Sequence, residues 1–375
     1  MHPPYDSEKL DRLMEAVGVD MVLVSTRHNI RYLCGGYFFH FHERFTAIGP
    51  GRYLPLAGVP RAAPGRAFLV GGGGEKGQAR DQDLWLELIP SERSPEAAAR
   101  DAAAAVRARG LERGRLAVER DFLPASAMET LAKELPGARF AEAQPILEEL
   151  RAVKRPDELD ILRRITQADA EAIQEAFRTS PPGPTTREVV RTLERGMTNR
   201  GLHFLWAFAS AGTAMLRAPS EKVWERGEAL HLDAGGSDGD YLTDVCRMGV
   251  RGKPSPLAEE VFQACLATQD RVRAAIRPGA LCGEIYELGQ KAFEETGFAG
   301  SGRFLIHGIG MVSHEQPRFG PGAERPLEAG MVASVETDIR HPEAGYVKIE
   351  DAVAVTPSGC EGLGDLGREA WAVVE

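Results

Sequence analysis

Cysteine is scarce in this sequence and never paired. The 375 residues include five cysteines, at positions 34, 246, 265, 282 and 360, and no Cys-x-x-Cys motif. An odd number of scattered cysteines argues against both a disulfide framework and a thiolate zinc site. We therefore expect most of them to be small buried side chains.

Basic charge and long apolar runs are also lacking. The formal net charge is -10, whereas nucleic acids and anionic membranes bind basic surfaces, so neither is expected as a partner. No apolar run approaches the length of a membrane span, and the first residues, MHPPYDSEKL, do not form a basic region followed by an apolar one. These absences predict a cytoplasmic protein with a small ligand.

The composition is that of a globular protein, with 43% hydrophobic and 27% charged residues, and the length suggests two domains. Up to about residue 147, strand-like runs (MVLVS, RAFLVG, RLAVE) alternate with helix-like ones (SEKLDRLMEAVG, SPEAAARDAAAAVRARG), which is typical of an α/β domain. A long helical pattern follows and is interrupted at Pro156, which is expected to open a new helix. The segment around this proline is predicted to join the domains.

Residues 228–250, EALHLDAGGSDGDYLTDVCRMGV, contain two short apolar runs, each with an aspartate. The alternation is typical of β-strands, and AGGSDGD between the runs is typical of a turn. A hairpin is therefore predicted, with Asp233 and Asp244 within the sheet. A lone carboxylate is unfavourable there, so something is expected to neutralise both.

The second part of the chain also contains a diverged internal repeat. Residues 181–201 and 277–297 both run Pro-Gly, then Glu five residues after that Gly and Gly eighteen after it. In each copy, a glycine also precedes a strand carboxylate at matched spacing: Gly227–Asp233 with Gly330–Glu336, and Gly239–Asp244 with Gly345–Glu350. The repeat predicts two halves related by a pseudo-twofold axis, with four acids converging on it.

Burying an ionised carboxylate costs several kcal/mol, whereas a whole domain is stable by only about 5 to 15 kcal/mol. The four acids must be protonated, paired with a cation or bound to metal, and only Lys348 and Arg247 lie close by in sequence. We expect two divalent metal ions, manganese first, with cobalt, zinc or iron as alternatives. An extended ion-pair network on two hairpins is the competing interpretation.

A histidine follows in RFLIHGIGMVSHEQP, where His307 ends a short apolar run and His314 and Glu315 lie seven and eight residues further on. A lone buried histidine is more often a core residue than a ligand. Here the order Asp, Asp, His, Glu, Glu resembles the pita-bread metallohydrolase family, which includes methionine aminopeptidase, aminopeptidase P, prolidase and creatinase. LRAVKRPDELDILRRI also resembles the linker helix of this family.

The resemblance implies an α/β (α+β) fold with a creatinase-like N-terminal domain, residues 1–147, and a pita-bread catalytic domain, residues 148–375. It also implies that Asp233 would chelate one ion, that Asp244 and Glu350 would bridge the pair, and that His307 and Glu336 would complete the ligands of the second ion. Glu336 would also move the proton of the attacking water, and His314 would bind the substrate near the scissile bond.

Three departures from the family pattern lie on the substrate side. A histidine expected upstream of the first metal aspartate is missing, and AMLRAP stands around its place. Glu336 is followed by Thr-Asp where many relatives have Pro-Gly, and Cys246 replaces a common threonine. Because side chains alternate along a strand, His231 should share the face of Asp233, Asp338 that of Glu336, and Lys348 that of Glu350. His231 and Asp338 are therefore candidate substrate residues, with Lys348 more easily explained as support or as a strand end turned to solvent.

These features predict a hydrolase of a C–N (amide) bond in a small molecule or dipeptide, of the Xaa-Pro dipeptidase or aminopeptidase type. The alternatives are an ectoine hydrolase- or creatinase-like enzyme acting on a small amide or amidine, a lyase of the same fold, and a non-catalytic binding module. Because the upstream histidine is missing and Asp338 adds a carboxylate, weak dipeptide turnover and a substrate with a positive group are expected. The aromatic segment 37–45, which carries His40 and His42 on one face, suggests a homodimer in which it caps a neighbour's pocket.

Overall fold

The computed structural model describes residues 2–43 and 51–375, which form two compact units, Met1–Leu150 and Arg151–Glu375. The sequence predicts the boundary at residue 147. The last two residues of the aromatic segment 37–45 lie outside the described residues. Among the described residues, no helix combines the length and apolar character needed to cross a membrane.

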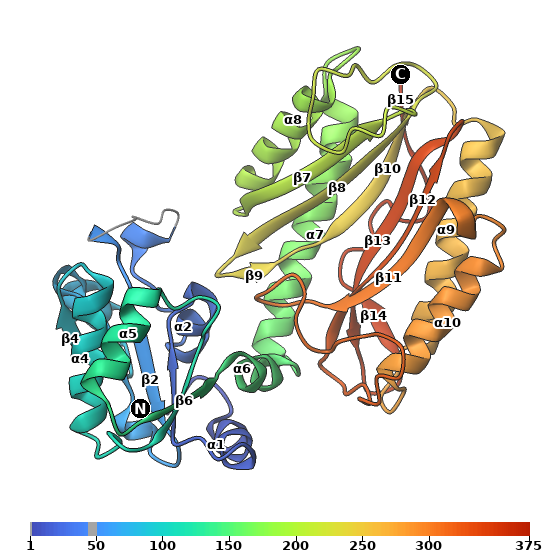
Figure 1. Ribbon diagram of the computed structural model, residues 1–375. Coiled ribbons are helices and arrows are strands. Elements are labelled where there is room, and N and C mark those ends of the chain that lie inside the picture. Colours follow the sequence, from blue (N-terminus) through green and yellow to red (C-terminus); the bar gives the residue numbers. More distant parts are fainter. Residues whose placement is uncertain (1, 44–50) are drawn as a thin grey trace. The chain divides into compact units, whose positions relative to one another are not determined.

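Unit 1 is an α/β layer structure (Figure 1). Its strands lie in the order β4-β3-β2-β1-β5-β6, and α4 and α5 bury their alanine- and leucine-rich faces against this sheet. The helices are α1 (Ser7–Ala16), α2 (Arg27–Leu33), α3 (Lys76–Asp81), α4 (Pro95–Arg107), α5 (Ala125–Glu134) and α6 (Gln144–Arg151). The strands are β1 (Met21–Val24), β2 (Leu56–Pro60), β3 (Phe68–Gly72), β4 (Glu87–Ser91), β5 (Arg115–Val118) and β6 (Arg139–Glu142).

The described part of the aromatic segment, residues 37–43, contains no β-strand. Its histidines lie on the 3-10 helix η1 (His40–His42), where His40 is exposed while His42 is buried and stacks on Tyr53 with ring centroids 4.2 Å apart. The prediction that they share one face is therefore wrong, because neighbours two apart do not align on a helix as they do on a strand. Phe41 is the large apolar side chain that this segment exposes within its described part.

Unit 2 carries its repeat in both sequence and topology. The helices are α7 (Pro156–Thr179), α8 (Thr186–Asn199), α9 (Pro256–Ala275) and α10 (Cys282–Glu294). The strands are β7 (His203–Ala211), β8 (Ala229–Asp238), β9 (Tyr241–Leu242), β10 (Val245–Arg251), β11 (Gly302–Gly308), β12 (Val332–His341), β13 (Gly345–Val355), β14 (Cys360–Gly362) and β15 (Ala372–Val374). Pro156 opens α7 as predicted.

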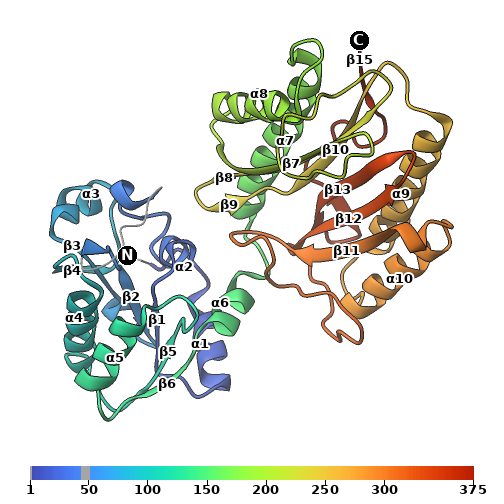
Figure 2. The same cartoon turned by 45° about the horizontal axis from the view of Figure 1, so that its top comes forward.

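The main sheet of unit 2 has the order β11-β12-β13-β10-β8-β7, so each half of the repeat supplies three neighbouring strands, and the two halves meet at β13 and β10. In both Figures 1 and 2, α8 runs beside β7, and α10 occupies the matching place beside β11. The glycines that open the two helical copies, Gly183 and Gly279, both have positive φ, a conformation that glycine adopts without strain. The predicted pita-bread repeat is confirmed.

The predicted hairpin is also present, but its turn is shorter than expected. β8 and β10 pair antiparallel, and β8 continues through Ala234, Gly235 and Gly236 to Asp238. A Cβ on Gly235 would lie 2.6 Å from the Trp206 ring, so this glycine serves close packing within a strand. The glycines of AGGSDGD indicated a turn because glycine is common both in turns and at closely packed positions within strands.

Candidate metal centre

Strand register brings the predicted acids together at the middle of the sheet. Glu336 on β12 lies directly opposite Glu350 on β13, and Cys246 on β10 lies opposite both Glu350 and Asp233 of β8. Asp244 immediately precedes β10. Side chains at facing positions of neighbouring strands lie on the same side of the sheet. The two halves of the repeat therefore contribute equivalent carboxylates to one buried site.

Asp244, His307 and Glu350 form a group of the size that a metal ion requires. One ligand atom from each lies within 4.8 Å of the others, and all three residues are buried. His307 Nε2 lies 3.9 Å from Asp244 Oδ2 and 3.7 Å from Glu350 Oε1. His307 Nδ1 donates to the Gly308 carbonyl 3.1 Å away, which leaves Nε2 facing the carboxylates in the tautomer that binds a metal. The donor set fits a divalent ion.

The Lys348 ammonium lies between three of the predicted acids. Its Nζ lies 2.6 Å from Glu336 Oε2, 2.6 Å from Glu350 Oε2 and 2.9 Å from Asp233 Oδ2. The side chain is buried, so a strand end turned to solvent is excluded, and the ion pairs agree with the expected supporting role. Pairing with lysine, one of the ways to neutralise the acids, is thus realised for three of the five predicted ligands.

The ammonium and the carboxylates shift one another's pKa values. Burial alone lowers the pKa of Lys348, but Glu350, Asp233 and Glu336 outweigh it and raise the pKa well above its usual range. Burial raises the pKa of Glu350, but Lys348 and His307 reverse this and lower it. The pKa values of Glu336 and Asp244 are raised, first by burial and then by the Glu350 charge.

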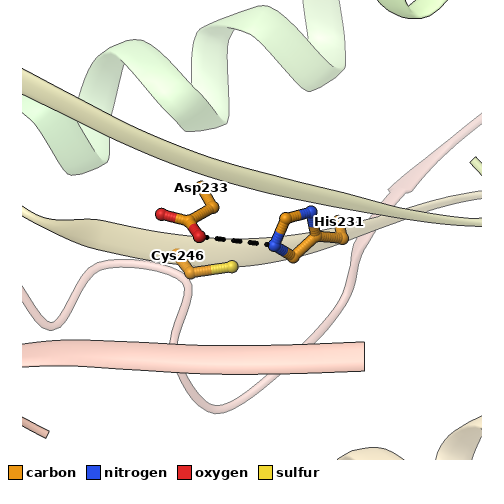
Figure 3. Close-up of side chains that lie close together, drawn as sticks. All are labelled: His231, Asp233 and Cys246. Carbon is orange, nitrogen blue, oxygen red and sulfur yellow. Dashed lines mark ion pairs between the residues drawn. The ribbon is translucent and has the colours of Figure 1, made fainter. Parts of the chain in front are cut away.

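A second group of possible ligands lies beside Asp233 (Figure 3). His231, Asp233 and Cys246 are all buried, with ligand atoms within 4.8 Å of one another, and His231 Nε2 lies 3.5 Å from Asp233 Oδ2. Cys246 Sγ donates instead to the Lys348 carbonyl at 3.4 Å, and burial raises the pKa of its thiol well above the usual value. The shared face predicted for His231 and Asp233 is observed. A role of His231 toward substrate stays a prediction.

An arginine stands in the segment where the family histidine is missing. Arg217 Nη2 lies 3.6 Å from Asp233 Oδ2, and the side chain is 35% exposed. Its guanidinium lies 4.1 Å from the Phe208 ring centroid, while its buried Nε has no hydrogen-bond partner among the described residues. The segment AMLRAP therefore places a cation, with unused donor capacity, next to the predicted metal ligands.

Asp338 already has two cationic partners. Arg303, its register partner on β11, donates from Nε to Asp338 Oδ2 at 2.8 Å, and Arg340 Nε lies 3.7 Å from Oδ1. The carboxylate is buried, with 2% of its side chain exposed. Its charge is therefore compensated before any substrate arrives, which removes the basis for expecting Asp338 to bind a cationic group.

The segment after β11 carries His314 and is fastened by Glu315. The His314 ring stacks on His307 with centroids 3.9 Å apart, and its pKa is lowered by burial and by His307. Glu315 is fully buried, and its two oxygens pair with Arg151 and Lys154, each at 3.0 Å. These pairs hold the backbone next to His314 against the first residues of unit 2.

Sequence reasoning did not assign roles to Lys348, Arg217, Arg151 or Lys154. Alternation gave the correct face for Lys348, and that signal, combined with the number of acids on the face, would have identified the ion pairs. The contacts of Arg151 and Lys154 with Glu315 span 164 and 161 residues, and nothing in a single sequence indicates them. Arg217 lies in the segment AMLRAP, which the missing histidine had already marked.

Comparison with known proteins agrees with this geometry. Residues 160–357 match metallopeptidase family M24, and residues 7–153 match the creatinase/prolidase N-terminal domain. The chain belongs to metallopeptidase family M24. As a member, it is a metallopeptidase with a site for divalent metal, and the predicted resemblance is confirmed.

Among the relatives of this family M24 member is the Xaa-Pro dipeptidase of Pyrococcus horikoshii, which is 24% identical over 96% of this chain and 97% of its own length. The Xaa-Pro dipeptidase of Pyrococcus furiosus is 29% identical over 61% of this chain and 68% of its own. The solved structure of an Xaa-Pro dipeptidase from Bacillus anthracis matches with a TM-score of 0.81 and 25% identity, covering 98% of this chain and 99% of that one.

Proposed function

We propose that this chain is a metal-dependent hydrolase of the C–N bond in a small substrate, and that Xaa-Pro dipeptides are its substrate class. The observation that carries the proposal is the buried group of Asp244, His307 and Glu350 in a chain of metallopeptidase family M24. The relatives named Xaa-Pro dipeptidase support the substrate class. Manganese stays the predicted metal, and a cytoplasmic homodimer stays the predicted state.

Asp244, His307 and Glu350 would hold the ion, and Asp233 and Glu336 complete the predicted ligand set. When bound, a divalent ion polarises the scissile carbonyl and acidifies a water molecule. The Glu336 carboxylate takes up the proton of the attacking water and returns it to the leaving nitrogen. Its raised pKa suits this task, because proton transfer is most effective when the pKa lies near the working pH.

His314 is placed to orient the substrate. Its lowered pKa keeps the imidazole neutral at pH 7, so the ring donates one hydrogen bond without adding a positive charge. Stacking on His307 fixes the plane of the ring beside the predicted ligand group. A donor held in this way stabilises the negative charge that develops on the carbonyl oxygen.

The charge around the site favours an anionic end on the substrate. Asp338 is compensated by Arg303 and Arg340, whereas Arg217 forms one long ion pair among the described residues, with Asp233, which Lys348 already shares. The C-terminal carboxylate of a dipeptide is a suitable acceptor, because a guanidinium binds a carboxylate through two parallel hydrogen bonds. Arg217 thus supports a dipeptide over a cationic amidine.

A kinetic panel tests the proposal with an Xaa-Pro dipeptide, the amide of that dipeptide and a small cyclic amidine. We expect dipeptide hydrolysis that a chelator abolishes and added manganese restores. Arg217→Gln should raise KM for the dipeptide roughly 10- to 100-fold, the loss typical of a charged hydrogen bond, and change KM for the amide much less. Arg187→Gln, a matched exposed arginine of α8, should change neither.

Turnover of the amidine without any hydrolysis of proline peptides would instead favour an ectoine hydrolase- or creatinase-like enzyme. Release of product by elimination would favour the lyase. Equal effects of Arg217→Gln on the dipeptide and its amide would show that Arg217 does not bind the substrate carboxylate.

A further inference from the structure

The five predicted ligands divide into two sets. Asp244, His307 and Glu350 form one group, in which one ligand atom from each lies within 4.8 Å of the others. The other two, Asp233 and Glu336, are joined through the ammonium of Lys348. Glu350 belongs to both sets, with Oε1 toward His307 and Oε2 toward Lys348.

Lys348 contacts three carboxylates at its position. Its Nζ donates a hydrogen bond to Asp233 Oδ2 at 2.9 Å and forms ion pairs with Glu336 Oε2 and Glu350 Oε2, each at 2.6 Å. These distances are those of close pairs between an ammonium and a carboxylate. The acceptors come from three different strands, β8, β12 and β13, so the position is defined by the sheet itself. Only 5% of the lysine side chain is exposed.

We propose that the ammonium of Lys348 replaces one of the two metal ions, so that this chain binds one divalent ion, at Asp244, His307 and Glu350. The inference rests on the proposed function in that it places the metal of that site. It differs from the two ions expected from the sequence, because Lys348 pairs with three of the acids that were expected to hold them.

The charges agree with a single ion. Asp233, Asp244, Glu336 and Glu350 carry four negative charges when ionised. One divalent ion, Lys348 and the nearby Arg217 supply four positive ones. A second divalent ion would add two positive charges to a buried site that is already neutral, next to a buried ammonium.

The group formed by His231, Asp233 and Cys246 is the other place where a second ion would find ligands (Figure 3). Its carboxylate is flanked by Lys348 and Arg217, so a cation entering there meets two positive charges. An ion at this group would contact sulfur, and a cobalt ion bound to thiolate absorbs in the near ultraviolet by sulfur-to-metal charge transfer. Cobalt therefore reports which position is filled.

The test is a cobalt titration of the full chain after chelation, with bound metal counted by elemental analysis after dialysis. Wild type should bind about one equivalent without thiolate charge-transfer absorption, and Lys348→Met should bind about two. Lys222→Met, which removes a lysine paired with Glu228 outside the site, should bind as wild type does.

Asp233→Asn gives a second measurement that does not depend on how well the Lys348 variant folds. If Asp233 pairs with Lys348 and does not bind the ion, this variant keeps one equivalent with an affinity within about threefold of wild type, whereas His307→Ala loses it. Two equivalents in wild type, or loss of one equivalent in Asp233→Asn, would overturn the inference and leave the proposed function standing. Thiolate absorption with the second equivalent would place that ion at Cys246. No bound cobalt in wild type would overturn both.

Discussion

Replacing Lys348 by methionine should destabilise unit 2 strongly, and more so without metal. The substitution keeps the apolar stem but removes a buried ammonium that pairs with Glu336, Glu350 and Asp233. Removing one partner of a buried ion pair typically costs about 3 to 5 kcal/mol. Three carboxylates depend on this cation, so we expect the upper end, about 5 kcal/mol in chelator, against a typical domain stability of about 5 to 15 kcal/mol.

Metal should restore part of this loss. An ion at a hundred times its dissociation constant stabilises the folded state by about 2.7 kcal/mol. If the variant binds one ion more than wild type, the difference between the two proteins should shrink from about 5 kcal/mol in chelator to roughly 2 kcal/mol with saturating manganese. The decisive result is whether manganese makes the difference in unfolding free energy between the two proteins smaller.

Urea unfolding followed by tryptophan fluorescence measures it, because three of the four tryptophans, Trp206, Trp224 and Trp371, belong to unit 2. Lys222→Met is the control and should lose less than about 1 kcal/mol, as partly exposed pairs do. A Lys348→Met protein as stable as wild type in chelator would refute the argument, since the carboxylates would then not need the ammonium.

Three further predictions concern titration, metal and assembly. Burial raises the pKa of Asp169 from 3.8 to about 8, so the contribution of this carboxyl to stability is complete below pH 3.8 and is lost as pH rises toward 8. Relative to Asp169→Asn, the free energy of unfolding of wild type in urea should fall by up to about 1.4 kcal/mol per pH unit across this window. Parallel pH curves for the two proteins would contradict this. His307→Ala should abolish manganese binding and activity together in elemental analysis and dipeptide assays, while the exposed His203→Ala should retain both. Light scattering should give twice the mass of one chain at micromolar concentration, with Phe41 as the exposed apolar residue of the aromatic segment; a monomer would exclude capping of a neighbour's pocket.

Most of the catalytic unit follows from local patterns in the sequence. Matched spacings between glycines and carboxylates identified the repeat, because each glycine takes a backbone conformation that other residues adopt only with strain. The same spacings identified Asp233 on β8 and Glu336 on β12 as equivalent positions of the two halves. Strand alternation then gave the faces of His231 and Lys348.

What the sequence did not predict depends on the reach of long side chains. Alternation sets the face of the sheet on which Lys348 leaves β13. Its four methylene groups allow the ammonium to contact either Asp338, its register partner, or the predicted metal ligands on the same face. Arg303 and Arg340 occupy Asp338, and this directs the lysine to Glu336, Glu350 and Asp233. Such a choice among several acids is made by the whole packed site.

The buried pairs of Glu315 also constrain the order in which this protein can be assembled. Arg151 and Glu315 are separated by 164 residues, and Lys154 and Glu315 by 161. During synthesis, the two cations leave the ribosome long before their carboxylate, and the N-terminal half of the repeat is complete before β11 exists. The segment that bears His314 therefore stays unfastened until the second half of the repeat has been made, so a nascent or truncated chain that ends before Glu315 contains Asp233 and Asp244 but has no means of becoming an active enzyme.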